Sequence, residues 1–234
     1  MSVTTSSLTR AAGAAAAAAG AIFIGVQIGH PQLNLTSIST TNVFIRDCFK
    51  VLMCALAVAG ISGMYLSQVR RNGVLGLVGW LVFSAGYLCI MCTTFVSTVV
   101  VPTLAGTNPG FVKDFLALAT SRGTVSGDVG VLPTVFQVQG ILYLAGGLLF
   151  GIALFRAHVL ARWAAVLLAV SGFASVVLSL MPDAFYRLLA YPNAIAMIGL
   201  GVSLWLSQRN VPSVETSASP TVPAPARVEP STLR

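Results

Sequence analysis

The chain has 234 residues, of which 56% are hydrophobic and 8% are charged, with 13 lysines and arginines against six acids. A soluble domain carries about a quarter charged residues, so this composition excludes a water-soluble globular protein and indicates that a lipid bilayer is the main solvent. The basic residues fall in short loops between apolar runs, where they set membrane orientation, and they do not favour a nucleic-acid partner.

Six apolar runs, each bounded by polar or charged residues, predict six transmembrane helices, because a bilayer span needs roughly 20 apolar residues. The predicted spans are 11–29, 43–66, 74–101, 134–155, 163–180 and 188–206. The first run is too long for the core of a signal peptide and no polar cleavage region follows it, so we expect it to remain in the protein. Its many small residues predict that it packs between other helices.

Two segments outside the apolar runs are long enough to have their own predicted structure or disorder. Residues 103–133 form the longest one and contain the amphipathic segment FVKDFLALA, which we expect at the membrane interface. Residues 210–234 are rich in Pro, Ser, Thr and Ala and show no apolar periodicity. They predict a disordered cytoplasmic tail that follows a six-span domain of residues 1–209.

The basic residues also predict orientation. With both termini in the cytoplasm, the inner loops and ends hold eight basic residues and the outer side holds five. The excess of positive charge inside favours an all-α, multi-pass protein of the cell membrane with both termini cytoplasmic. The same topology places all four aspartates on the outer side.

The third run, from Gly73 to Pro102, has no charged residue but carries a polar and aromatic stripe. The stripe residues recur at spacings of three and four, which places them on one helical face. They are Trp80, Ser84, Tyr87, Met91, Thr94 and Thr98. Because unpaired polar groups are costly in hydrocarbon, we expect this face to contact other helices or a cavity.

Two aspartates are the candidate proton donors. Asp47 follows Arg46 and precedes Lys50 at the start of the second run. It is either an acid at the edge of the hydrocarbon that is available for catalysis, or an interfacial helix-start residue neutralised by Lys50. Asp183 follows Pro182 and is either a helix N-cap or a second carboxylate on the rim of the same cavity.

Further polar side chains in the fourth and sixth runs either form hydrogen bonds between helices or line a pocket together with the third run. The residues predicted for that pocket are Trp80, Tyr87, Thr94, Gln139, Tyr143 and Asn193. No metal ligands or cofactor are expected, because the two histidines fall on opposite sides of the predicted topology. We interpret the mid-span pair Cys89 and Cys92 as small buried apolar residues.

Residues 143–172, the His30-Pro31 pair after the first run and the FVSTVVVPTLAG segment around Pro102 resemble small multi-span membrane proteins of actinobacteria. That resemblance implies a fold and does not fix a chemistry. The chain is also similar in size to the small integral-membrane terpene cyclases of meroterpenoid pathways. These are helical bundles without metal that use intramembrane acids to protonate a prenyl alkene or epoxide.

The second resemblance implies a role for each candidate residue. Asp47 would be the general acid, and Asp183 would orient it or take the final proton. Trp80, Tyr87 and Tyr143 would stabilise a carbocation by cation–π attraction. The function that we expect is therefore a membrane enzyme acting on a lipophilic small molecule.

Two other functions stay open. The chain could be a small transporter or exporter whose path is lined by the third span, or a non-enzymatic subunit that packs against a larger membrane partner. The sequence leaves the oligomeric state open.

Overall fold

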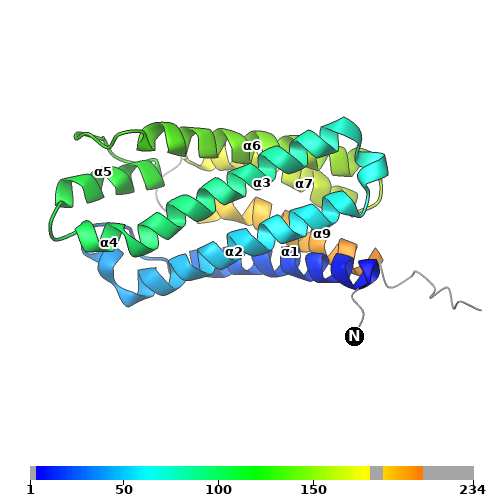
Figure 1. Cartoon of the computed structure of the whole chain (residues 1–234), viewed down its shortest axis with the longest axis horizontal. Helices are drawn as coiled ribbons and strands as arrows, with labels where there is room; N and C mark the ends of the chain where they lie inside the picture. Colours follow the sequence, from blue (N-terminus) through cyan, green and yellow to red (C-terminus); the bar gives the residue numbers. More distant parts are fainter. Residues whose placement is uncertain (1–3, 180–186, 208–234) are drawn as a thin grey trace, which may run out of the picture.

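The computed structural model describes residues 4–179 and 187–207, and all of the regular structure in these ranges is helical. The predicted tail and Asp183 lie outside the described residues. Six long helices form the body of the protein (Figure 1). They are α1 Thr5–Gln27, α2 Thr41–Leu66, α3 Val69–Val99, α6 Leu132–Ala157, α7 Arg162–Ser179 and α9 Tyr191–Ser207.

Each long helix coincides with one of the predicted apolar runs, although the ends differ by a few residues. The first helix starts earlier than its apolar run because Thr4 and Ser7 form a capping box at its N-terminus. Four helices, α1, α2, α3 and α6, are long and apolar enough to cross a membrane. The apolar helices α7 and α9 are shorter over the part of the chain that the structure describes.

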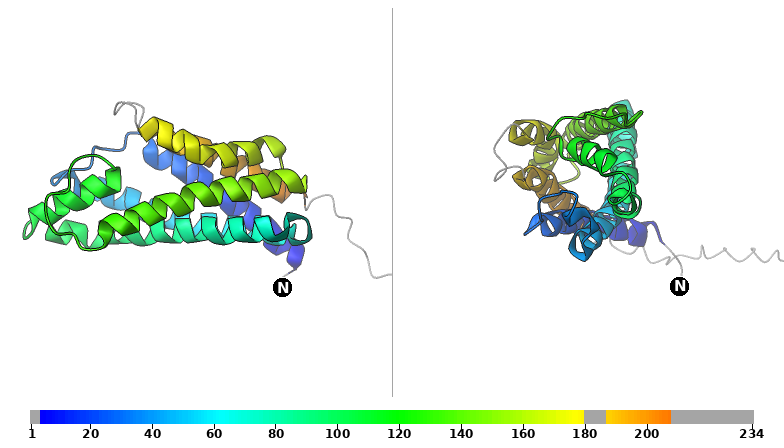
Figure 2. Two further views of the ribbon diagram at one scale, coloured as in Figure 1. Left: turned by 90° about the horizontal axis from the view of Figure 1, so that it is seen from above. Right: turned by 90° about the vertical axis from the view of Figure 1, so that its left-hand side faces the viewer.

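The six helices form a closed ring. Helix α1 packs along α2, and the order continues through α3, α6, α7 and α9, which returns to pack along α1. Viewed end-on, the helices surround a common axis (Figure 2, right). Helix α1 therefore packs between α2 and α9, as predicted for a run made of small residues, although the sequence did not indicate which helices would be its neighbours.

Glycines bring the helices of the ring into close contact. In the α3–α6 pair, Gly79 and Gly86 face the backbone of α6, and Gly146 faces the backbone of α3. In the α1–α9 pair, Gly13 and Gly201 face each other's backbone. Small residues serve this purpose inside a bilayer, where packing and interhelical hydrogen bonds replace the hydrophobic effect between helices.

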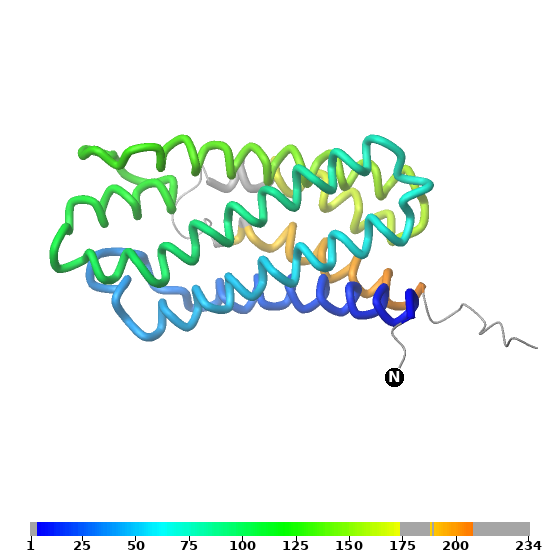
Figure 3. The backbone as a smooth tube through the Cα atoms, viewed as in Figure 1, coloured from blue at the N-terminus to red at the C-terminus, as the bar shows by residue number. Residues whose placement is uncertain are grey.

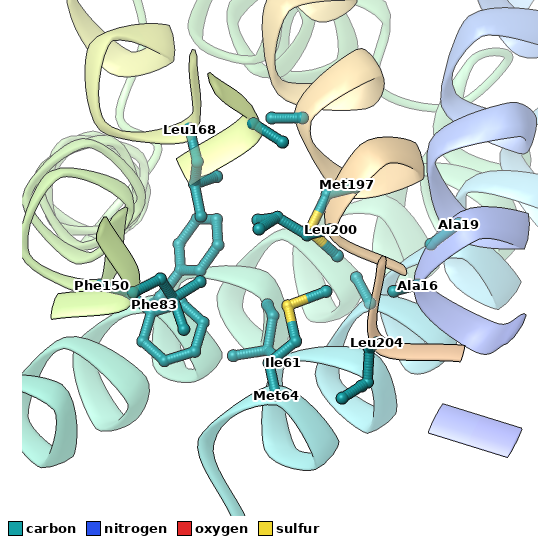
Figure 4. Packing of buried hydrophobic residues seen from close by; sticks show 14 of the residues in the cluster. Ala16, Ala19, Ile61, Met64, Phe83, Phe150, Leu168, Met197, Leu200 and Leu204 are labelled. Atoms are coloured by element: carbon teal, nitrogen blue, oxygen red, sulfur yellow. The ribbon is translucent and has the colours of Figure 1, made fainter. Parts of the chain in front are cut away.

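Large apolar side chains fill the half of the ring interior that lies toward the α2–α3 and α6–α7 turns, and they also cover the outside of the ring. The interior cluster includes Phe83, Phe150, Leu168, Met197 and Leu200, all fully buried (Figure 4). Large apolar side chains also stay exposed on the outer surfaces of the helices. Examples are Phe49, Leu81, Phe95, Trp163 and Phe173. A protein that is apolar inside and outside fits a lipid environment.

One end of the ring is covered by the longest connections (Figure 3). It holds the 3₁₀ helix η1 (Ser37–Ser39) and the short helices α4 (Val101–Leu104) and α5 (Pro109–Thr120). We call this the α5 end. The amphipathic helix α5 turns Val112, Phe115 and Leu116 into a second apolar cluster with Ile38 and Val101. Its apolar face is thus used for packing within the protein.

The opposite end of the ring, the arginine end, is defined by the arginines at the turns and helix ends there. These are Arg10, Arg70, Arg71, Arg156 and Arg162. The described aspartates, Asp47, Asp114 and Asp128, all lie at the α5 end. The charges are therefore divided between the two ends as the sequence predicts for these residues.

Candidate functional site

A cavity of about 170 Å³ lies at the α5 end, enclosed by α2, α3, α5 and α6. Its polar lining consists of Asp47, Lys50, Thr93, Thr94, Ser97 and Gln139. Its apolar lining comes from Leu33, Ile90, Phe115, Ala119 and Phe136. Because ionic, hydroxyl and amide groups converge there on a half-apolar hollow, this cavity is the candidate functional site.

An acidic and a basic side chain meet on one wall. Asp47 is only 2% exposed, and the Nζ atom of Lys50, one helical turn later, donates a 2.7 Å hydrogen bond to its Oδ1 atom. Lys50 Nζ also lies 2.9 Å from Nε2 of His30, whose Nδ1 atom lies 2.8 Å from the carbonyl oxygen of Pro31. Since that carbonyl can only accept, Nδ1 carries the ring proton and Nε2 accepts from Lys50. The result is a linear chain of proton-exchanging groups beside the cavity.

The structure contains the ion pair with Lys50 that belongs to the non-catalytic interpretation of Asp47, and Asp47 lies near the start of α2. The carboxylate nevertheless faces the interior of the protein and lines the cavity. An ion-paired carboxylate accepts protons, so the arrangement provides a base in its resting state.

The opposite wall joins α3 to α6. The hydroxyl of Thr93 donates a 2.8 Å hydrogen bond to Oε1 of Gln139. Thr94 and Ser97 lie beside it on α3 and also line the cavity. These groups can orient a polar ligand group opposite Asp47.

A second polar cluster lies deeper in the ring and outside the cavity lining. The hydroxyl of Tyr87 donates a 2.8 Å hydrogen bond to Oδ1 of Asn193, which is fully buried. The ring of Tyr143 meets that of Tyr87 edge to face at 5.6 Å. The cluster therefore connects α3, α6 and α9 through the core.

Trp80 lies apart from both groups. Its ring stacks on Tyr65 of α2 at 5.0 Å, and its indole N–H donates to the hydroxyl of Ser62. Trp80 and Thr94 are 14 positions apart, or about 21 Å along a helix, so one small cavity cannot include both. The structure thus brings Asp47, Thr94 and Gln139 together and places the other described pocket candidates elsewhere.

Sequence reasoning missed three polar residues at or beside the cavity and also its aromatic lining, Phe115 and Phe136. Thr93 and Ser97 lie next to the predicted stripe, one position before Thr94 and Thr98, so the stripe was drawn too narrow. His30 comes from the loop after α1, and a loop residue carries no periodic signal.

Helix α5 covers the cavity through Phe115 and Ala119, and a carboxylate of the same helix holds the loop that follows it. Asp114 accepts hydrogen bonds from the backbone N–H groups of Ser126, at 3.1 Å, and Gly127, at 2.8 Å. These two donors lower the pKa of Asp114 below its ordinary value. The loop after α5 is thereby tied to the helix that closes the cavity.

The described residues contain no group of three His, Cys, Asp or Glu side chains that could hold a metal ion. The cavity is lined by a carboxylate, an ammonium group, hydroxyls and an amide, and the imidazole of His30 contacts the ammonium group. Such a set can bind a polar group and exchange protons with it. No protein-family model, curated protein or solved structure matches this chain.

Proposed function

We propose that this protein is a metal-independent membrane enzyme that transfers protons to and from a lipophilic small molecule. The reaction that we propose is the proton-initiated cyclisation of a prenylated compound. The observation that carries the proposal is Asp47, which is 2% exposed and lines a cavity within the helical bundle. Buried ionisable groups in such a cavity are costly to maintain and are typical of functional sites.

The proposal includes six membrane spans. Helices α7 and α9 have 18 and 17 described residues, or about 26 Å each, close to the ~30 Å hydrocarbon core. They complete a ring with four helices of membrane-spanning length, so we infer that they cross the bilayer as well. The arginine end would then face the cytoplasm with both termini, and the cavity would lie toward the outer side of the cell membrane.

The Asp47–Lys50 pair supplies a closed proton cycle. When an apolar substrate displaces water, separated charges become less favourable, and the proton on Lys50 Nζ passes 2.7 Å to Asp47 Oδ1. Asp47 then gives this proton to an alkene carbon or epoxide oxygen, and ring closure moves the positive charge along the substrate. The neutral amine of Lys50 removes a proton from the final cation, which forms an alkene and restores the ion pair.

Aromatic rings adjoin the proton donor. Phe115 and Phe136 line the cavity and meet edge to face at 5.6 Å, so their faces are candidates to stabilise a carbocation. The volume of about 170 Å³ is below the 300–1,000 Å³ of typical small-molecule sites. The cavity therefore fits the reacting end of a prenyl chain, and we propose that α5 moves to admit the whole substrate.

The test is to incubate membranes containing the protein with farnesylated and geranylgeranylated aromatic acceptors and their epoxides. Wild-type protein should yield a product of unchanged mass and altered chromatographic retention. Asp47→Asn should abolish it, and Asp183→Asn tests the predicted second acid. Asp128→Asn is the matched control, because Asp128 is exposed at the same end and bonds only to the backbone N–H of Gly130 in the described structure. Product formation that is unchanged in Asp47→Asn would refute the site.

A transporter is the second candidate, and the closed ring of helices is the observation that favours it. Phe83, Phe150 and Leu168, however, fill the ring interior between the cavity and the arginine end. This filled core favours a site that opens to one side of the membrane, as the enzyme requires, over a continuous transport path. Substrate uptake into proteoliposomes without chemical change would support the transporter over the enzyme.

A further inference from the structure

A second cavity, of about 480 Å³, lies at the arginine end, far from the Asp47 cavity. It is formed by the turn between α2 and α3 and by the connection between α6 and α7. Its lining includes Gln68, Arg70 and Arg71, with Leu66, Val69 and Val159 beside them. The proposed enzyme mechanism makes no use of this surface.

The turn contains two buried amides without partners. Gln68 is 4% exposed and lines the cavity, and neither atom of its amide has a hydrogen-bond partner in the described structure. Asn72, one helical turn later, is 5% exposed and its amide atoms also lack partners. No other turn in residues 4–179 and 187–207 has two such neighbouring amides. Buried amides are normally satisfied, and of these two only the Gln68 amide lines the cavity, so it indicates a ligand there with both hydrogen-bond acceptors and donors.

The backbone holds the two arginines at this place. Gly73 has a φ of +55°, which interrupts α3 and separates its first turn, 69–72, from the rest of the helix. Arg70 and Arg71 therefore lie in a short turn beside the amides, and both are exposed. The ion pair that the described structure contains lies at the other end of the ring, so no carboxylate in the described residues neutralises these guanidinium groups.

We propose that this cavity binds the head group of an anionic glycerophospholipid whose head group carries free hydroxyls, as in phosphatidylglycerol. The guanidinium groups of Arg70 and Arg71 would bind the phosphodiester, which is the anion that their planar donors match. The Nε2 atom of Gln68 would donate to a phosphate or hydroxyl oxygen, and a head-group hydroxyl would donate to Oε1 of Gln68. Leu66 and Val69 are 66% and 45% exposed at the edge of the cavity, where they would contact the acyl chains. This apolar edge favours a lipid over a free anion.

The test uses the full chain purified in detergent, with phosphatidylglycerol, phosphatidic acid, phosphatidylcholine or inorganic phosphate added. The thermal unfolding midpoint and the retained lipid are measured. Phosphatidylglycerol should raise the midpoint in a concentration-dependent way, because a ligand of the folded state stabilises it. Phosphatidylcholine and inorganic phosphate should not. Equal stabilisation by inorganic phosphate would overturn the assignment to a lipid.

Variants locate the site. Arg70→Gln/Arg71→Gln should weaken the apparent affinity for phosphatidylglycerol about a hundredfold, since two charge-assisted contacts are lost and each is worth roughly one decade. Arg156→Gln/Arg162→Gln removes the same charge at the same end and should keep the affinity. Gln68→Leu should fold, because it removes two unpartnered atoms at nearly constant size, and should lose the preference for phosphatidylglycerol over phosphatidic acid. The proposal is wrong if the two double variants bind alike.

Discussion

Replacing Lys50 should destabilise the protein more than replacing Asp47, although the two side chains form one ion pair. The Asp47 side chain is 3% exposed and the Lys50 side chain is 21% exposed. Lys50→Met leaves a buried carboxylate without the hydrogen bond that the described structure gives it, which costs about 3–5 kcal/mol. Asp47→Asn leaves an ammonium group that reaches water and still contacts His30, so the loss is about 1–2 kcal/mol. We therefore expect Lys50→Met to be the more destabilising change by about 2 kcal/mol.

The assay is unfolding of the purified protein in detergent micelles, with a double-mutant cycle that includes Asp47→Asn/Lys50→Met. The double variant carries no charge at this pair of positions and should be more stable than Lys50→Met alone. Equal losses in the two single variants, or a double variant that is no more stable than Lys50→Met, would refute the reasoning.

Three further variants test other contacts. Tyr87→Phe removes the hydrogen bond to Asn193 and should cost about 0.6–1.7 kcal/mol in thermal unfolding, whereas no loss would mean that the buried amide is satisfied otherwise. Gly86→Ala places a Cβ atom 2.8 Å from the backbone nitrogen of the facing α6 residue and should cost about 1–3 kcal/mol, and Gly140→Ala, where nothing lies within 4 Å, should cost nothing. The pKa of Asp114 is lowered, so its stabilising effect should be complete above the ordinary carboxyl range and lost only below it. Asp114→Asn should speed amide hydrogen exchange in the loop after α5 at neutral pH, and an unchanged rate would show that this carboxylate does not hold the loop.

Local sequence patterns predicted the helices well because lipid imposes a simple rule on them. A span must be long, apolar and closed on its own hydrogen bonds, and each of these requirements is visible in consecutive residues. The Asp47–Lys50 contact was predictable for the same reason, since residues three apart share a helical face. The division of charge between the two ends was predictable because successive loops between antiparallel helices alternate between one end of the bundle and the other.

The arrangement of the helices was not predictable in this way. Nothing within α1 or α9 indicates that they pack together, because their contact depends on residues nearly 190 positions apart, such as Gly13 and Gly201. Likewise, the stripe on α3 predicts which face of the helix points inward but not which neighbours each of its residues contacts. Trp80, Tyr87 and Thr94 point inward from three successive levels and therefore meet three different sets of neighbours.

The contact between α1 and α9 also constrains biosynthesis. The ribosome makes α1 first and α9 last, so the ring cannot close until nearly the whole chain has been translated and inserted. Until that moment, the glycine-rich side of α1 has no permanent neighbour and must be covered by lipid or by the insertion machinery. A chain truncated before α9 should consequently be a substrate for membrane quality control, even though all the residues of the Asp47 cavity would already be present.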